Sequence, residues 1–341
     1  MRALLAVLAA TVAFYGAPSA AADDTQHCAA GPAPVLSLAY GSRYAPDSPG
    51  RSDLDAAADA AMDRALAPVD QFLRDLARQA NSAYAASDSV AADCVVQQIA
   101  AWARADALSD LRTPTARLTI GSRLAGFGLV LRQTIPLAED ADAVHVSLDW
   151  LSGLVDTQMH FWEEDAPGGA AQGNLRAWAA LAAASVSVLT DDPVQRGWAA
   201  WSARYVMCKA EPDGSLPQEM SRGRFALHYQ LHSTAPLVLT TALLRNAAID
   251  LTEVCDGALK RIVDYSVSDL RTGSATLART GQVQTYFDGS RQLEGFNLAW
   301  AEAYLTLHPD PALDRLAEEF RPLAHSKLGG DQTLLWQMVS Q

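Results

Sequence analysis

Residues 213–236 (DGSLPQEMSRGRFALHYQLHSTAP) carry the side chains of this chain that are best suited to chemistry. Hydrophobic pattern and propensity predict a helix that begins near residue 220 and ends before a proline. Arg222 and Tyr229 are seven residues apart in the sequence, about two helical turns, so we expect both side chains on one helical face. His232 follows Tyr229 by one further turn and is expected close to that face.

A guanidinium, a phenol and an imidazole on one face could bind an acidic sugar and deprotonate it. The alternative from this segment alone is that Tyr229 is a core aromatic residue with a satisfied hydroxyl, and that Arg222 is a solvated charge. Clustered polar groups mark functional sites only statistically, so both interpretations stay open at this point.

A second informative segment is QGNLRAW, residues 172–178. Asn174 and Trp178 are four residues apart and are predicted to share a face near the start of a helix. An asparagine there could instead be a helix cap, and Trp178 could be a core residue rather than a stacking surface for a sugar. Arg176, between them, is a further substrate-binding candidate.

Other chemistries have less support in the sequence. Asp213 and Glu219 could be posed as the carboxylate pair of a glycoside hydrolase, but Asp213 precedes a glycine and is better explained as a turn residue. No Gly-rich phosphate loop, zinc-protease helix motif or nucleophile-elbow serine is present. Trp198, Trp201 and Tyr205 form a helical stripe, which we interpret as a core face.

The balance of charge is acidic, because 26 Lys and Arg face 39 Asp and Glu, for a net charge of −13. This argues against nucleic acid as a partner. It also counts mildly against a polyanionic substrate. Screening limits that long-range repulsion to about 10 Å at moderate salt, so a local basic cleft would be sufficient to bind one.

Residues 1–22 are typical of a secretory signal, with one arginine, an apolar run and small residues for cleavage. No later stretch is predicted to span a membrane, so we expect a periplasmic or secreted protein. Disulfides are allowed there. We expect one between Cys28 and Cys94, which would tie the N-terminal segment to a helix, and we expect Cys208 and Cys255 to be buried free thiols.

After a Pro/Gly/Ser-rich segment (residues 23–50), helical patterns follow one another, and only residues 282–287 weakly suggest a strand. This predicts one all-α domain over residues 23–341, an α/α toroid or incomplete barrel of paired helices. The helices are expected at residues 54–80 (divided at Pro68), 88–108, 115–138, 141–162, 171–190, 193–209, 220–235, 236–247, 250–269, 293–307 and 311–323.

Together these segments resemble the periplasmic alginate lyases, the poly(mannuronate) lyases with an α/α-toroid fold. The resemblance covers nearly the whole mature chain. It rests on PVLSLAYGSRYAPDSPGRSDLD around Arg43, the Asp93-Cys94 pair, WARADAL, Asn174 with Trp178, DGSLPQE followed by Arg222 and Tyr229, Trp300, Glu302, Tyr304 and LGGD. One departure is Leu175, which stands where the family has a histidine. His232, or alternatively His228, is the candidate to take over its part.

The resemblance implies cleavage of a uronic-acid polymer by β-elimination, with mannuronate-rich alginate favoured and glucuronan-like polymers next. Asn174 and Arg222 would neutralise the substrate carboxylate, and Tyr229 would act as base and then as acid. Trp178 and Arg43 would hold flanking sugars. No metal or organic cofactor is implied, and we expect a monomer. Leu175 keeps open the alternative of a non-catalytic exported polysaccharide-binding protein.

Overall fold

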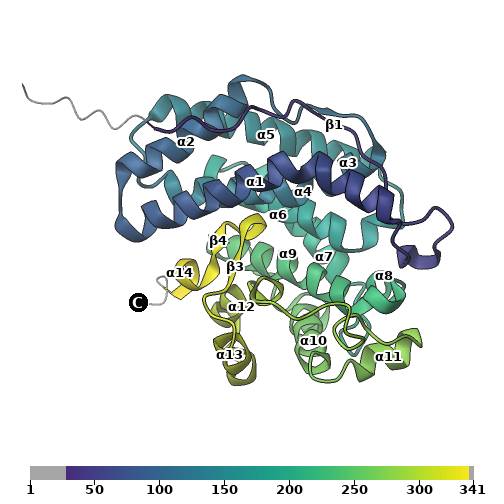
Figure 1. Cartoon of the computed structure of the whole chain (residues 1–341). Coiled ribbons are helices and arrows are strands. Elements are labelled where there is room, and N and C mark those ends of the chain that lie inside the picture. Colours follow the sequence, from purple (N-terminus) through teal and green to yellow (C-terminus); the bar gives the residue numbers. More distant parts are fainter. Residues whose placement is uncertain (1–27, 338–341) are drawn as a thin grey trace, which may run out of the picture.

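The structure is a computed structural model that describes residues 28–337, and helices dominate it. The helices are α1 (Ala56–Ala86), α2 (Ser89–Arg104), α3 (Pro114–Thr119), α4 (Gly121–Thr134), α5 (Ala141–Glu164), α6 (Asn174–Thr190), α7 (Pro193–Met207), α8 (Pro217–Met220), α9 (Ala226–Asn246), α10 (Val254–Asp269), α11 (Ser274–Thr280), α12 (Ala301–Leu307), α13 (Pro311–Glu318) and α14 (Gln332–Gln337). Figure 1 shows their order. The predicted signal segment lies outside the described residues.

Strands are limited to two short pairs within the described chain. β1 (Ser37–Leu38) pairs in parallel with β2 (Asp110–Leu111), and β3 (Ala324–His325) pairs antiparallel with β4 (Gly330–Asp331). The weak strand expected at residues 282–287 is wrong, because that segment forms turns.

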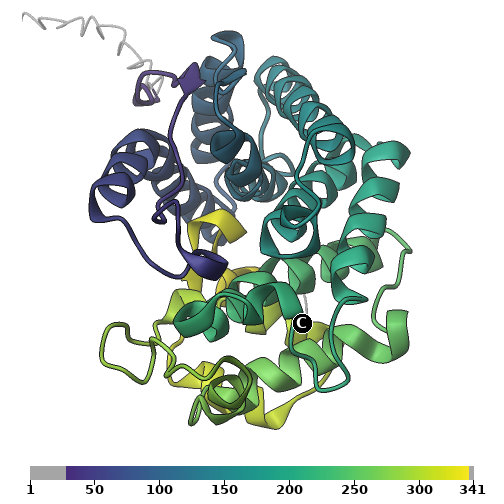
Figure 2. The ribbon, with the colours of Figure 1, turned by 90° about the vertical axis from the view of Figure 1, so that its right-hand side faces the viewer.

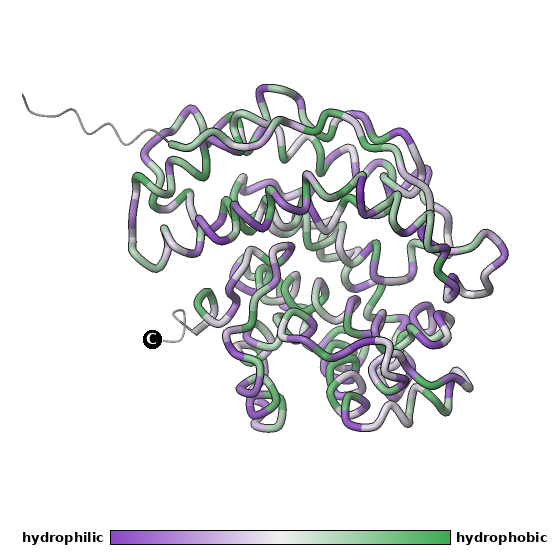
Figure 3. Tube along the Cα trace, in the orientation of Figure 1, coloured by the Kyte–Doolittle hydropathy of each residue, from purple (hydrophilic) through white to green (hydrophobic). Residues whose placement is uncertain are grey.

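The helices pair around an incomplete ring, which confirms the predicted all-α toroid (Figure 2). The inner helices α4, α6 and α9 are buried along most of their length. α4 and α6 can approach closely because Gly121 and Gly128 of α4 have no Cβ. A Cβ on Gly121 would lie 2.9 Å from the nitrogen of Ala179, and one on Gly128 only 2.3 Å from Oγ of Ser185. In Figure 3, hydrophobic and hydrophilic stretches alternate along the outer helices, as expected of helices with one buried face. That residues 23–341 form a single domain stays a prediction.

Two predicted helix breaks at prolines are wrong. Pro68 lies inside α1 and Pro236 inside α9, each within one continuous helix. A proline in a helix interior removes one backbone hydrogen bond and costs about 3 kcal/mol. Residues on both sides of Pro236 are buried, so tertiary packing outweighs that cost.

The helix predicted over residues 220–235 is also wrong in its first part. α8 ends at Met220, a short 3-10 turn spans Gly223–Phe225, and α9 begins at Ala226. Gly223 has a φ of 57°, a left-handed conformation that ends the helical course and that glycine adopts without strain. Arg222 therefore lies in the turn before α9 and not on the helix that carries Tyr229.

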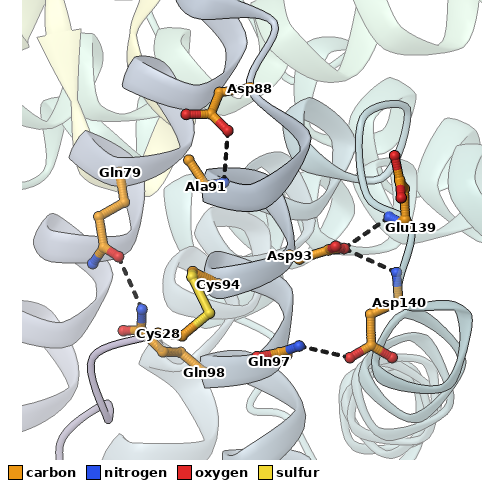
Figure 4. Close-up of a disulfide and its surroundings, with 10 residues drawn as sticks. All are labelled: Cys28, Gln79, Asp88, Ala91, Asp93, Cys94, Gln97, Gln98, Glu139 and Asp140. Atoms are coloured by element: carbon orange, nitrogen blue, oxygen red, sulfur yellow. Dashed lines mark hydrogen bonds between the residues drawn. A yellow bond between two sulfur atoms is a disulfide. The ribbon is translucent and has the colours of Figure 1, made fainter. Parts of the chain in front are cut away.

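The Cys28–Cys94 disulfide is confirmed and fixes the N-terminal segment to α2 (Figure 4). Next to it, the carboxylate of Asp93 accepts hydrogen bonds from the backbone nitrogens of Glu139 and Asp140, 2.7 and 2.9 Å away. The prediction of free thiols at Cys208 and Cys255 is wrong, because these two residues form a second disulfide that joins the end of α7 to the start of α10.

Candidate active site

A pocket of about 390 Å³ opens between α4, α6, α9, the C-terminal segment and a loop before α1. The described residues that line it include no aspartate or glutamate, and its cations are Arg43, Arg51, Arg123, Arg222 and Lys327. In a chain with a net charge of −13, this is the local basic cleft that an anionic ligand would require.

Tyr229, in the first turn of α9, lies at the centre of a cluster of three side chains. Its hydroxyl forms a hydrogen bond with the hydroxyl of Tyr44. The guanidinium carbon of Arg222 lies 4.1 Å from the ring centroid of Tyr229 and 4.9 Å from that of Tyr44. The predicted proximity of Arg222 and Tyr229 is thus confirmed, although the shared helix that motivated it is absent.

The electrostatics of this cluster keep Arg222 charged. Burial opposes the charge, but Tyr229, Tyr44 and Glu219 nearby raise the pKa of Arg222 above its usual value. Burial, together with the neighbouring Tyr229, raises the pKa of Tyr44 far above its usual range. Nε of Arg222 is buried without a hydrogen-bond partner, so the guanidinium retains a donor for a ligand.

Asn174 is held at the pocket wall by the fully buried carboxylate of Glu219. The Asn174 backbone nitrogen donates to Oε1 at 2.7 Å, and Nδ2 lies 3.1 and 3.0 Å from the two carboxylate oxygens. Ser233 Oγ donates to the same Oε1 at 2.8 Å. Burial raises the pKa of Glu219, and these donors oppose that shift. Gly173 permits the approach, because a Cβ there would lie 2.4 Å from Oε1.

Trp178 and two histidines of α9 form an aromatic wall. The ring of Trp178 lies 5.2 Å from that of His232, and the His232 ring is parallel to that of His228 at 6.3 Å. Burial lowers the pKa of His228 to about 3 and that of His232 well below its usual value. Both imidazoles are therefore neutral near pH 7, so neither brings a positive charge to the pocket. Nε1 of Trp178 is buried and has no partner.

The loop of residues 41–55, which we call the arm, brings Arg43 and Tyr44 to the pocket. The backbone nitrogen of Asp55 donates to the carbonyl of Arg43 at 3.0 Å, and Arg43 lies 3.1 Å from Asp59 and 3.5 Å from Asp63 of α1. Figure 1 shows the arm at the same end of the molecule as α8. There, a Cβ on Gly50 would lie 1.9 Å from the carbonyl oxygen of Ser221, so the contact requires glycine.

Arg176 does not line the pocket, so its prediction as a substrate-binding residue is corrected. It is buried, and its guanidinium pairs with Glu163 and donates to Ser202 Oγ at 3.2 Å. Its guanidinium carbon lies 4.4 Å from the ring centroid of Trp201, with Trp198 and Tyr205 at 5.5 and 5.3 Å. The stripe of these three aromatic residues is not simply a core face, since Trp201 is 48% exposed.

The carboxylate pair considered for glycoside hydrolysis does not form in the pocket. Asp213 does not line the pocket; it binds Arg279 and the nitrogen of Ser215. Glu219 is engaged by Asn174 and Ser233. Tyr44, Lys327 and the positioning role of Glu219 were missed from the sequence, because each acts through contacts with segments far away in the chain.

The chain combines an α/α toroid with a cationic pocket that contains tyrosine, asparagine and arginine side chains. A family model described as alginate lyase matches residues 34–276, and the chain belongs to this family. It is accordingly a polysaccharide lyase, which is a carbon–oxygen lyase. No helix in the described residues is long and apolar enough to cross a membrane.

Curated relatives agree with this assignment, and solved structures share the fold. An alginate lyase of Pseudomonas syringae pv. tomato is 25% identical over 92% of this chain and 84% of its own length. A polysaccharide lyase of Stenotrophomonas maltophilia is 27% identical over 80% of each. A histidine-to-alanine variant of alginate lyase A1-III in complex with a tetrasaccharide superposes with a TM-score of 0.79 at 20% identity, covering 90% of this chain and 85% of the other. The enzyme of Sphingomonas species A1 gives 0.76 at 19% identity, over 90% and 86%.

Proposed function

We propose that this protein is an exported lyase that cleaves a uronic-acid polymer by β-elimination, with mannuronate-rich alginate as the favoured substrate and glucuronan-like polymers next. The observation that carries this proposal is the pocket itself, where cations surround Tyr229 and none of the described lining residues is acidic. Two disulfides suit an oxidising compartment.

The first requirement of the reaction is neutralisation of the substrate carboxylate. The proton on the carbon next to a charged carboxylate is weakly acidic, because its removal adds a second negative charge. Arg222 can bind the carboxylate through two parallel N–H groups, a geometry that lysine cannot reproduce. The amide nitrogen of Asn174 carries two hydrogens and is oriented by Glu219. We assign to it a donor role toward the same carboxylate.

The second requirement is a group that moves the proton. In mannuronan the proton to be removed and the leaving glycosidic oxygen lie on one face of the sugar. A single residue can therefore take the proton as the carbon–oxygen bond breaks, and then protonate the leaving oxygen. Tyr229 is that residue in our proposal. Tyr44 hydrogen-bonds its hydroxyl, and the guanidinium of Arg222 lies over its ring.

Ultraviolet absorbance tests the proposal, since elimination leaves a double bond conjugated to the carboxylate and hydrolysis does not. The protein would be incubated with poly-mannuronate, poly-guluronate, glucuronan and hyaluronan. We expect absorbance to grow fastest with poly-mannuronate. New reducing ends without any rise in absorbance would overturn the elimination mechanism, and a faster reaction with poly-guluronate would overturn the substrate assignment.

A further inference from the structure

Unlike Arg43 and Arg123, Lys327 lines the pocket without an ion pair of its own, although the carboxylate of Asp70 lies near enough to raise its pKa. Arg43 pairs with Asp59 and Asp63 of α1. Both carboxylate oxygens of Asp70 bind Arg123, at 2.9 and 2.8 Å. The ammonium of Lys327, which also lines the pocket, has neither a hydrogen-bond acceptor nor an ion-pair partner among the described residues.

The backbone around Lys327 is fixed before any ligand arrives. Its nitrogen donates to Nδ1 of His325 at 3.1 Å. The carbonyl of Gly329 accepts from Gln133 of α4 at 2.7 Å and from Asn81 of α1 at 3.2 Å. Gly329 and Gly330 adopt φ values of 90° and 105°, a region that favours glycine. This segment, seen in Figure 1 beside α1, therefore presents the lysine from a rigid base.

Several other lining groups bring no positive charge to a carboxylate, because Leu175 is apolar, the histidines of α9 are neutral and Asn174 offers only a neutral amide donor. Two of the remaining cations, Arg43 and Arg123, are already engaged by carboxylates. A partly buried, unpaired ammonium is costly unless an anion joins it. We propose that Lys327 binds a carboxylate of the uronate substrate and is a specificity-determining residue of this site. This inference rests on the proposed function.

The surroundings of Lys327 also predict how binding depends on pH. Burial and the charge of Arg123 lower the pKa of Lys327 to about 8, so its charge is present at neutral pH and is lost as pH rises through that value. The titratable and charged groups near it are Asp70 and Arg74 of α1, Arg123 of α4, Arg43 of the arm, His232 of α9 and His325 of β3.

Calorimetric titration with a mannuronate tetrasaccharide tests this inference in the Tyr229→Phe background, in which the ligand should stay intact. We expect Lys327→Met to weaken the Kd about 10- to 100-fold, as for loss of a charge-assisted hydrogen bond. Lys327→Arg should retain binding, and its affinity should no longer fall between pH 7 and 9. Lys260→Met is the matched control, since Lys260 is exposed and pairs with Asp264 on the outer helix α10.

The outcomes separate this inference from the proposed function. An unchanged Kd in Lys327→Met, with elimination intact in the wild-type protein, would overturn the role of Lys327 alone. A wild-type protein that binds no uronate oligomer would overturn both. If Lys327→Met weakened the binding of a neutral mannose tetrasaccharide by the same factor, the variant would have lost packing rather than a charge interaction. That result would also overturn the role of Lys327. Thermal unfolding of each variant establishes that it is folded.

Discussion

The hydroxyl groups of Tyr44 and Tyr229 are hydrogen-bonded to each other across 185 residues of sequence. One comes from the arm and the other from the first turn of a buried helix. The guanidinium of Arg222 lies within 5 Å of both ring centroids. The residue assigned to proton transfer therefore shares a hydrogen bond with a loop, so the position of the arm bears directly on the geometry of Tyr229.

Removal of the Tyr44 hydroxyl tests this coupling. In Tyr44→Phe, we expect kcat to fall about 2- to 12-fold, because one hydrogen bond of about 0.5–1.5 kcal/mol to the proton-transferring group is lost. Initial rates of ultraviolet absorbance on poly-mannuronate measure it. Tyr84→Phe is the matched control, since Tyr84 does not line this pocket. Equal rates for the wild-type protein and Tyr44→Phe would remove Tyr44 from the mechanism.

The arm also carries Arg43, which we predict to act in binding rather than in chemistry. Arg43→Ala should raise KM several-fold and leave kcat nearly unchanged, because Arg43 lines the pocket but does not contact Tyr229. Steady-state kinetics on poly-mannuronate separate the two constants. An unchanged Michaelis constant would refute this assignment.

Glu219 is expected to matter first for stability. Glu219→Ala leaves the backbone nitrogen and amide of Asn174 and the hydroxyl of Ser233 without their acceptor. Each unsatisfied buried group costs about 1–3 kcal/mol. Urea unfolding should therefore show a clear loss in the free energy of unfolding, and a much smaller loss in Glu219→Gln. Identical midpoints for Glu219→Ala and the wild-type protein would contradict the buried network.

The pH dependence of that stability follows from the direction of the Glu219 pKa shift. The pKa of Glu219 is higher in the folded protein than in the unfolded one. At pH values between these two pKa values, the folded protein therefore binds more protons than the unfolded protein. Its stability should decrease as pH rises from the unfolded pKa through the folded one. In urea titrations over the same pH range, Glu219→Gln should lack this pH-dependent part of the free energy of unfolding. If stability changed with pH equally in Glu219→Gln and in the wild-type protein, Glu219 would not be its source.

The disulfide between Cys208 and Cys255 should contribute substantially to stability. It closes a loop of 47 residues, for which chain entropy predicts about 4 kcal/mol. A Cys208→Ser/Cys255→Ser double variant should have a lower melting temperature than the wild-type protein. Because the variant lacks this bond, a reductant can lower its melting temperature only through the other disulfide. A melting temperature equal to that of the wild-type protein would show that the bond is absent or without effect.

Local pattern was sufficient for much of the fold. The helix expected at residues 141–162 is observed as Ala141–Glu164, and the Cys28–Cys94 bond is present as expected. The helix break predicted at Pro236 is wrong, because burial of α9 outweighs the loss of one hydrogen bond. The bond between Cys208 and Cys255 was not predicted, since the periodicity of a sequence does not indicate which helix ends lie next to each other.

The candidate site was predictable only where its residues are neighbours in sequence. Tyr229 and Arg222 were expected together and are together, but a turn at Gly223 brings them there rather than a shared helix. Lys327 lies nearly a hundred residues further along the chain. Its entry into the pocket depends on how β3 and β4 are anchored to α1 and α4, which no local pattern indicates.

The most direct test of the central proposal compares the wild-type protein with Tyr229→Phe on poly-mannuronate. If Tyr229 moves the proton, the rate at which ultraviolet absorbance increases should be about 10²- to 10⁴-fold lower in Tyr229→Phe. Binding of a mannuronate tetrasaccharide should be retained, because the ring and the packing of Arg222 on it remain. A Tyr229→Phe protein that still forms the unsaturated product at a rate close to that of the wild-type protein would contradict the account.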